Sequence, residues 1–287
     1  MPRIRMSLCA AVIVTLAALG CGPRAASVSS STPATPQFEA YAIRYASIPF
    51  RVSGLIAGAD TSRRLDIAMM VWLLKAPGRN VLVDAGFYRE PLVTRWKPNG
   101  FMKPSDAVAK FGVRPEEVTD VIVSHVHWDH LDGADLFPNA RIWIQREEFE
   151  HHLNADGSVR DRAIDAVDAK MLSQIALQGR VRLVDGDAKE IIPGITVYTG
   201  GKHTFASQFA TVKLASGTAV IASDNMYLYE NLEKHLPIAQ TLDAASNLRA
   251  QERMTTLASD PRLIVPGHDP AVFSRFSSAG NGVVRIR

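Results

Sequence analysis

The feature that most constrains the fold is a cluster of polar residues at the end of an apolar run. Val118 to Val123 is typical of a buried strand, and the segment His125 to His130 reads His-Val-His-Trp-Asp-His. The chain has only 8 histidines in 287 residues, so chance or ordinary surface histidines explain this density poorly. Imidazole and carboxylate are ligands of zinc and similar metals, and a strand that ends in a turn can aim alternate residues at one point. The spacing predicts ligands for two adjacent metal ions.

The N-terminal residues are typical of an export signal. Arg3 and Arg5 precede a mostly apolar stretch, Leu8 to Leu19, that is too short for an ordinary membrane span. Residues 18–21 resemble a bacterial lipoprotein cleavage box, with alanine where leucine is usual. This predicts a signal peptide over residues 1–21, acylation of Cys21, and a periplasmic or envelope-anchored lipoprotein whose membrane contact is the N-terminal lipid. Cleavage by ordinary signal peptidase near residues 25–27 is the alternative.

The rest of the chain is expected to form a tether and one catalytic domain. Residues 22–37 are rich in Ser, Thr and Pro without periodic apolar positions, which is typical of a flexible tether, and residues 38–287 are long enough for one substantial core. The two cysteines, Cys9 and Cys21, lie in the export segment, so the domain has no thiol for disulfides, zinc ligation or nucleophilic attack. The net charge of +3 without a long basic block argues against nucleic acid as a partner. The oligomeric state stays open.

Short β-rich runs alternate with amphipathic helices along the domain. A hairpin is expected around Pro77 and Gly78, and the helices should pack on the outside of sheets that lie within. The expected strands cover residues 68–75, 80–84, 118–124, 141–145, 181–184, 195–199, 209–214, 218–222 and 262–265, and the two long helices cover residues 161–178 and 242–257. The pattern predicts a layered α/β fold.

Four more polar residues follow predicted strands, as in the His125 to His130 cluster. They are Asp84, His203, Asp224 and His268. Loops at strand ends are where α/β folds place binding groups, because the scaffold fixes these loops and leaves them accessible. Each residue alone could be an ordinary turn or loop residue, so it is their order along the chain that favours a site.

In this order the residues resemble the metallo-β-lactamase superfamily, and the resemblance covers about Ala68 to His268. It implies an αββα sandwich, in which two packed mixed β-sheets are flanked by helices and the metals lie at one edge. It implies a first metal held by His125, His127 and His203, a second held by Asp129, His130 and His268, with Asp224 bridging the two and Asp84 orienting ligands. The third motif departs from the family, because Lys202 separates Gly201 from His203 and the Pro-Gly turn is missing; the loop shape should differ while His203 stays the ligand.

Within the superfamily, the chain is most similar to the N-acyl homoserine lactonase branch. Those enzymes carry a tyrosine three residues after the bridging aspartate, as Tyr227 follows Asp224, and Gly267-His268-Asp269 also resembles their final motif. The absence of a cysteine in the domain argues against zinc β-lactamases with a Cys ligand. The short stretch after His268 argues against the glutathione-binding region of glyoxalase II-like enzymes.

The resemblance implies a metal-dependent hydrolase that opens a lactone ring, a quorum-quenching activity. A hydroxide bridging two Zn²⁺ ions would attack the ring carbonyl, with Fe, Mn or Co as other possible metals. The phenol of Tyr227 would stabilise the oxyanion, and Asp129 would deliver a proton to the departing alkoxide. Alternatives are hydrolysis of another small ester, amide or thioester by a β-lactamase-like or glyoxalase II-like enzyme, or a non-catalytic metal-binding protein. Phe87, Trp96 and Trp128 could line an apolar channel or belong to the core.

Overall fold

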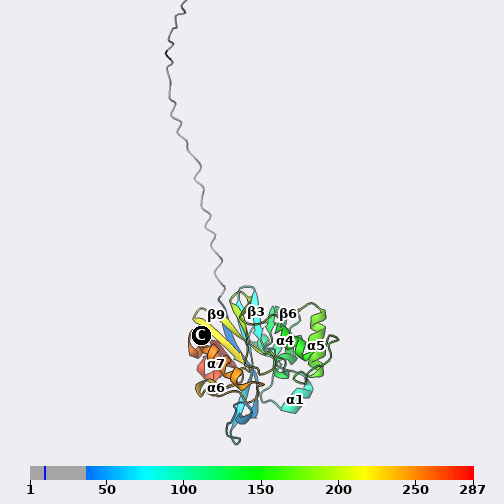
Figure 1. The fold of residues 1–287 in the computed structure, drawn as a ribbon, viewed down its shortest axis with the longest axis vertical. Helices are drawn as coiled ribbons and strands as arrows, with labels where there is room; N and C mark the ends of the chain where they lie inside the picture. Colours follow the sequence, from blue (N-terminus) through cyan, green and yellow to red (C-terminus); the bar gives the residue numbers. More distant parts are fainter. Residues whose placement is uncertain (1–9, 11–36) are drawn as a thin grey trace, which may run out of the picture. The chain divides into compact units, whose positions relative to one another are not determined.

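Two β-sheets that pack face to face form the centre of the protein (Figure 1). The computed structural model describes residue 10 and residues 37–287, so the predicted signal peptide and tether lie almost entirely outside the described residues. The larger sheet has the order β12-β13-β1-β2-β3-β4-β5-β6, and the smaller one has the order β11-β10-β9-β8-β7. None of the described helices is long and apolar enough to cross a membrane.

The larger sheet is mixed, with two long antiparallel strands at its centre. The strands are β1 (Glu39–Arg51), β2 (Arg64–Ala76), β3 (Arg79–Val83), β4 (Asp120–Ile122), β5 (Arg141–Gln145), β6 (Val181–Val184), β12 (Ser277–Gly280) and β13 (Val283–Ile286). The strands from β3 to β6 run parallel, whereas β2 and β3 form the expected hairpin, in which Gly78 at φ 71° closes the turn.

The smaller sheet carries the strands that precede three of the predicted ligands. Its strands are β7 (Lys189–Ile192), β8 (Ile195–Thr199), β9 (Gln208–Leu214), β10 (Gly217–Ser223) and β11 (Ile264–Pro266). Antiparallel pairs connect β7 to β10, and β10 pairs with β11 in parallel. Because β8, β10 and β11 all end at the same edge, the loops that follow them meet there.

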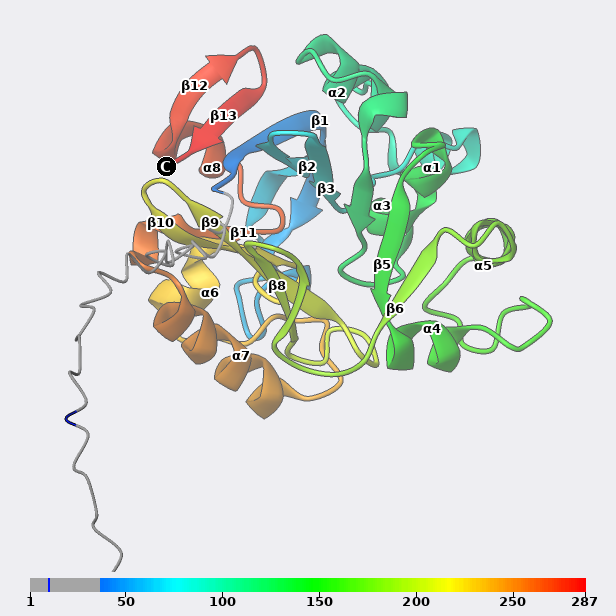
Figure 2. The same cartoon turned by 90° about the horizontal axis from the view of Figure 1, so that it is seen from above.

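Helices cover the outer faces of both sheets (Figure 2). They are α1 (Glu90–Trp96), α2 (Pro104–Lys110), α3 (Trp128–Leu131), α4 (Arg146–His152), α5 (Ala166–Leu177), α6 (Tyr229–Glu233), α7 (Ala244–Leu257) and α8 (Val272–Arg275). Figure 2 shows α4 and α5 beyond the larger sheet and α7 along the smaller one. The predicted αββα sandwich is therefore confirmed.

Three apolar layers hold the sandwich together. Alternate residues of one strand enter different layers, so Trp72 belongs to the layer between the sheets, which also contains Val197, while Val71 belongs to the layer on the helix side, which also contains Leu172 of α5. A third layer places Met254 of α7 against the outer face of the smaller sheet. This alternation fixes which residues of each strand face a neighbouring layer.

Strands β1, β7, β12 and β13 were not among the predicted strands, and helix α5 begins later than predicted. Strand β1 contains Pro49, which cannot donate a backbone hydrogen bond. Past Arg44, β1 pairs with β2 on one side and meets Asn99 only in an isolated bridge at Ser47 on the other, so no second ladder runs past Pro49. Helix α5 begins at Ala166 rather than at residue 161, and Val167 is 57% exposed. The preceding residues form a turn in which Asp161 accepts a hydrogen bond from Ala163 N.

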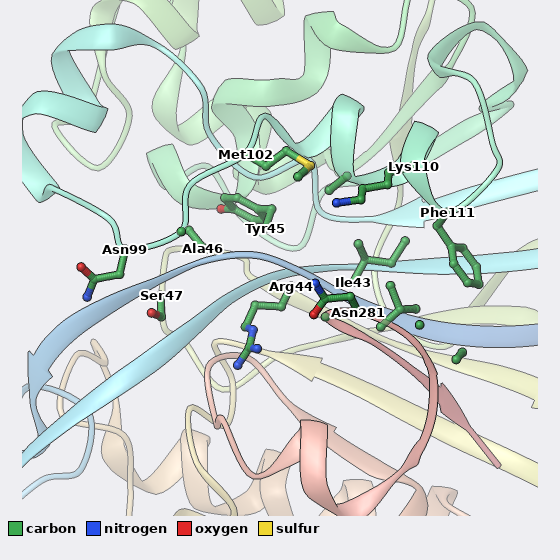
Figure 3. Close-up of a pocket in the computed structure, with 16 residues that line it drawn as sticks. Ile43, Arg44, Tyr45, Ala46, Ser47, Asn99, Met102, Lys110, Phe111 and Asn281 are labelled. Atoms are coloured by element: carbon green, nitrogen blue, oxygen red, sulfur yellow. The ribbon is translucent and has the colours of Figure 1, made fainter.

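A cavity of about 720 Å³ opens between β1, α2 and the β12–β13 hairpin (Figure 3). Arg44, Lys110 and Asn281 lie around it, and Phe111 contributes an apolar wall. None of the predicted metal ligands lines this cavity, so the chemistry expected from the sequence lies elsewhere.

Candidate metal centre

The structure brings all seven predicted ligands to one edge of the sandwich. His125 and His127 lie in the loop after β4, and Asp129 and His130 lie on α3, so these four come from the larger sheet. The other three follow strands of the smaller sheet: His203 after β8, Asp224 after β10 and His268 after β11. The site therefore spans both sheets.

The side chains divide into two clusters, and the first consists of His125, His127 and His203. Nε2 of His125 lies 3.0 Å from Nδ1 of His127, and Nε2 of His203 lies 3.1 Å and 2.9 Å from these two atoms. The second cluster consists of Asp129, His130 and His268. Three imidazole nitrogens about 3 Å apart match the spacing of ligand atoms around one zinc-sized ion, because each such ligand lies about 2 Å from the metal.

Hydrogen bonds on the far side of each ring fix the histidine tautomers. Nδ1 of His203 donates to the Gln240 carbonyl at 2.7 Å, and Nδ1 of His268 donates to the Ala68 carbonyl at 3.0 Å. In the same way, Nδ1 of His130 faces the Asp84 carboxylate at 2.8 Å, while its buried Nε2 has no hydrogen-bond partner within residues 37–287. All three Nε2 atoms therefore face the centre, and each can present a lone pair to a divalent metal ion once it carries no proton.

Asp84, which the family resemblance implied to orient ligands, contacts His130 and two serines that directly precede ligands of the two sheets. Its carboxylate accepts hydrogen bonds from Ser124 N at 2.8 Å, Ser124 Oγ at 3.0 Å and Ser223 Oγ at 2.7 Å, besides the contact with His130. Ser124 Oγ in turn lies 2.9 Å from Nδ1 of His125 and can accept its proton. The two serines were not among the predicted site residues, because a serine after a strand carries no distinctive sequence signal.

Asp224 lies between the two clusters. Its Oδ2 is 3.4 Å from Nε2 of His203 and 3.3 Å from Nε2 of His130, and its Oδ1 is 3.0 Å from Nε2 of His268. Within the described residues, Oδ1 nevertheless makes no hydrogen bond of acceptable geometry. A buried carboxylate whose two oxygens face imidazole nitrogens of both clusters has the geometry of a group that bridges two cations.

The electrostatics of the two clusters differ. Burial, followed by neighbouring imidazoles, lowers the pKa of His125 well below its ordinary value, and burial is also the main cause that lowers the pKa of His203 and brings that of His127 to about 4. Burial opposes the charged form of His130 and His268 too, but the nearby carboxylates of Asp224 and Asp129 outweigh it and raise both pKa values. In the metal-free protein the first cluster is therefore neutral at neutral pH, and the second holds protons more tightly.

Acidification should therefore release metal from the second cluster first. A metal that binds there displaces protons, so its affinity should fall by up to ~10-fold per displaced proton for each pH unit below the raised pKa values, whereas the first cluster should be nearly insensitive between pH 6 and 8. Dialysis at pH 8, 7 and 6 followed by elemental analysis checks this. Equal loss from both clusters would contradict the assigned difference in protonation.

The loop around His203 shows how the departure from the family motif is accommodated. Lys202 adopts φ 59°, and its Nζ donates to the Phe205 carbonyl at 2.6 Å. The left-handed backbone conformation of Lys202 turns the chain, and Nε2 of His203 lies next to the ring nitrogens of His125 and His127. The extra lysine does not remove the histidine from the cluster.

Tyr227 and Asp129 line the same pocket, next to the clusters. The pocket measures about 160 Å³, and the Tyr227 hydroxyl lies 3.5 Å from Nδ1 of His203. Trp96 and Trp128, considered as channel residues from the sequence, line it with their rings stacked 5.0 Å apart, whereas Phe87 is fully buried beneath Trp128. The remaining apolar wall comes from the β1–β2 region, which the sequence did not indicate: Ile48, Phe50, Leu55, Ile67 and Met69.

A buried carboxylate network anchors the segment that follows α3. Arg89 pairs with Asp132, Asp135 and Asp168, and the Asp132 carboxylate also accepts hydrogen bonds from the backbone N–H groups of Tyr88 and Arg89. Burial, followed by the charge of Asp132, raises the pKa of Asp168 to about 8. Asp168 is therefore protonated in the folded protein at neutral pH.

Replacing Asp168 with asparagine should stabilise the protein relative to wild type as pH rises. The folded pKa of about 8 lies above the unfolded value of about 3.8, so the stability linked to the bound proton is lost as pH climbs toward 8. The amide of asparagine does not titrate in this pH range, so it contributes no such pH dependence to the stability. The Tm of Asp168→Asn minus that of wild type should increase by ~3 °C or more between pH 6 and pH 8. The same difference for Asp165→Asn, a substitution at an exposed aspartate nearby in the sequence, should not change with pH. Parallel Tm curves for wild type and Asp168→Asn would refute the raised pKa.

Comparison with known proteins identifies the family of this chain. The model of the metallo-beta-lactamase superfamily matches residues 69–268. The chain belongs to this superfamily. It is a metal-dependent hydrolase of the metallo-beta-lactamase fold, and the clustered imidazoles and carboxylates described above are its candidate metal site.

Curated members of the superfamily with similar sequences are N-acyl homoserine lactonases. One from a Bacillus species is 24% identical over 220 residues, covering 71% of this chain and 82% of the relative. Another, AttM from Rhizobium johnstonii, is 31% identical over 183 residues, covering 61% of this chain and 66% of the relative.

Solved structures of the same superfamily share the fold. A variant of AiiA from B. thuringiensis with N-decanoyl-L-homoserine at its active site has a TM-score of 0.67 at 20% identity, covering 85% of this chain and 98% of that one. The dizinc quorum-quenching lactonase AidC has a TM-score of 0.62 at 17% identity, covering 82% and 92%.

Proposed function

We propose that this protein is a lactonase that hydrolyses N-acyl homoserine lactones with two Zn²⁺ ions held by the two clusters and Asp224. The observation that carries the proposal is one pocket in which Tyr227 and Asp129 lie beside the clusters and face an apolar wall. A polar ring would reach the ligand clusters, and an acyl chain would lie against the wall. The similarity to curated N-acyl homoserine lactonases supports this substrate class.

The residues of the pocket suit the steps of ring opening. Bound metal ions would supply a water nucleophile that is deprotonated near neutral pH and would polarise the carbonyl. Burial, followed by the charges of Asp224 and Asp129, raises the pKa of Tyr227 well above 10, so the phenol stays protonated and donates a hydrogen bond to the carbonyl oxygen as negative charge develops. Burial raises the pKa of Asp129, but His130 outweighs it and the carboxyl is ionised. Asp129 can accept the proton of the attacking water and return it to the ring oxygen when the C–O bond breaks.

A pH-stat assay on purified protein of known metal content tests the proposal. Acid release from homoserine lactones that is much faster than from linear esters, amides or thioesters of similar size supports a lactonase. Faster turnover of one of the other classes would establish the alternative hydrolase, either β-lactamase-like or glyoxalase II-like. Two bound metals without turnover of any compound would indicate a non-catalytic metal-binding protein.

We also propose that the protein is exported and lipidated at Cys21. The support is the sequence of residues 1–21. Mass spectrometry of the mature protein from a bacterial host should show an N-terminal acylated Cys21. A free N-terminus near residues 25–27 would indicate ordinary signal-peptidase cleavage instead.

A further inference from the structure

Glu148 is a buried carboxylate that no step of the proposed reaction uses. It lies on α4, directly after β5, and is 0% exposed. Its Oε1 accepts hydrogen bonds from Val126 N at 3.2 Å and from Thr204 Oγ1 at 2.5 Å. Its Oε2 accepts a hydrogen bond from Ala206 N at 2.6 Å. Each oxygen of this carboxylate is therefore occupied by donors from loops that are distant in sequence.

Those donors belong to the two loops that carry the first cluster. Val126 lies between His125 and His127, and Thr204 directly follows His203. The first loop follows a strand of the larger sheet and the second follows a strand of the smaller sheet. Glu148 thus joins the two halves of the sandwich at the point where the three imidazoles converge.

We propose that Glu148 is a positioning residue for the first metal: it holds the His125–His127 loop against the His203 loop, so that the three nitrogens already converge before metal binds. Preorganised ligands bind metal more tightly than ligands that must first be brought together, and groups that orient ligands typically contribute about 10- to 100-fold in affinity. The proposal rests on the assignment of the first cluster as a metal site and is independent of the lactone as substrate.

One basic side chain faces the Glu148 carboxylate. Within residues 37–287, the structure shows no Lys or Arg paired with it, and the basic group that faces it is Nε2 of His152, 3.5 Å from Oε1. Nδ1 of His152 lies 3.1 Å from the Asp161 carboxylate. His151, His152 and Asp161 could form a metal site by proximity, but both ring nitrogens of His152 already face carboxylates. We therefore interpret His152 as the basic neighbour of the Glu148 carboxylate and not as a metal ligand.

Glu148→Gln is the sharpest test, because it keeps the shape and replaces one acceptor oxygen with an NH₂ group. In either orientation of the amide, the NH₂ group faces a backbone N–H, of Ala206 or of Val126, and one contact becomes a donor–donor repulsion. Zinc affinity is measured by chelator competition in two backgrounds: His268→Ala, which weakens the second cluster, and His203→Ala, which weakens the first. We expect Glu148→Gln to weaken binding ~10- to 100-fold in the His268→Ala background and less than ~3-fold in the other.

Controls separate positioning from general stability. Glu150→Gln changes a carboxylate on the same helix whose side chain is 59% exposed, and it should leave both affinities unchanged. Thr204→Val removes one hydrogen bond to Glu148 and should weaken zinc binding at the first cluster ~3- to 10-fold. Thr204→Ser keeps the hydroxyl and should bind zinc with the affinity of the unsubstituted background. The Thr204 pair also provides the test if Glu148→Gln does not fold. Unchanged affinity in the His268→Ala background, or an equal loss in both backgrounds, would overturn the proposal.

Discussion

Asp224→Asn is expected to reduce hydrolysis by several orders of magnitude and to strip the centre of at least one metal. Both oxygens of Asp224 face the clusters: Oδ1 lies 3.0 Å from Nε2 of His268, and Oδ2 lies 3.3 Å from Nε2 of His130. The amide keeps the shape but loses the negative charge that offsets two cations, and one oxygen becomes a donor. Residues that only orient ligands contribute about 10- to 100-fold to metal affinity, so a bridging ligand should contribute more than ~100-fold.

Elemental analysis after exhaustive dialysis, together with turnover of the best lactone at increasing zinc, checks this expectation. Asp185→Asn serves as a control, since the Asp185 side chain is 67% exposed and pairs with Arg146 far from the ligands. Full metal content with wild-type turnover in Asp224→Asn would exclude the bridging role. Low metal content that excess zinc restores, with recovered turnover, would show that affinity alone is affected.

Tyr227→Phe should lower kcat about 10²- to 10³-fold and leave KM and metal content nearly unchanged. The phenol is buried and stays protonated because its pKa is raised, so it can donate a hydrogen bond to an oxyanion. Loss of one donor to a developing oxyanion typically has an effect of this size, and it appears in kcat when the bond strengthens in the transition state.

Tyr229→Phe is the matched control for this experiment. Tyr229 is also buried, but it packs under Arg275 and does not line the pocket of Tyr227. Its loss should change kcat less than ~2-fold, because only groups that meet the reacting atoms affect the chemical step. Similar losses in both variants would point to a general effect on stability, and unchanged kcat in Tyr227→Phe would remove Tyr227 from the reaction.

The ligand clusters could be predicted because their signal is local. A strand is recognisable from a few apolar residues, and the first residues of the following loop lie near the sheet edge whatever the rest of the chain does. His203, Asp224 and His268 are single residues with ordinary explanations, and it was their order after successive strands that linked them to His125–His130. The face-to-face packing of the two sheets then brought them together at one edge of the sandwich.

The supporting groups could not be predicted because their roles depend on non-local contacts. Glu148 lies in the segment Arg146–His152, whose other charged residues are ordinary helix-surface groups, and nothing in that segment shows which carboxylate points inward. Likewise, the apolar wall formed by Ile48, Phe50 and Met69 belongs to the β1–β2 region, and β1 was not among the predicted strands. Such roles follow from tertiary packing, which local propensity does not determine.

The pairing of β1 with β13 has a consequence for how the protein is made. Ile43 lies opposite Val283, so the first strand of the domain finds one of its two neighbours only after β13 has left the ribosome. Until then β1 exposes an open edge to other chains, and closing so long a loop is slow. The larger sheet is therefore completed only late in synthesis, and until then the open edge of β1 is a site at which the nascent chain can aggregate.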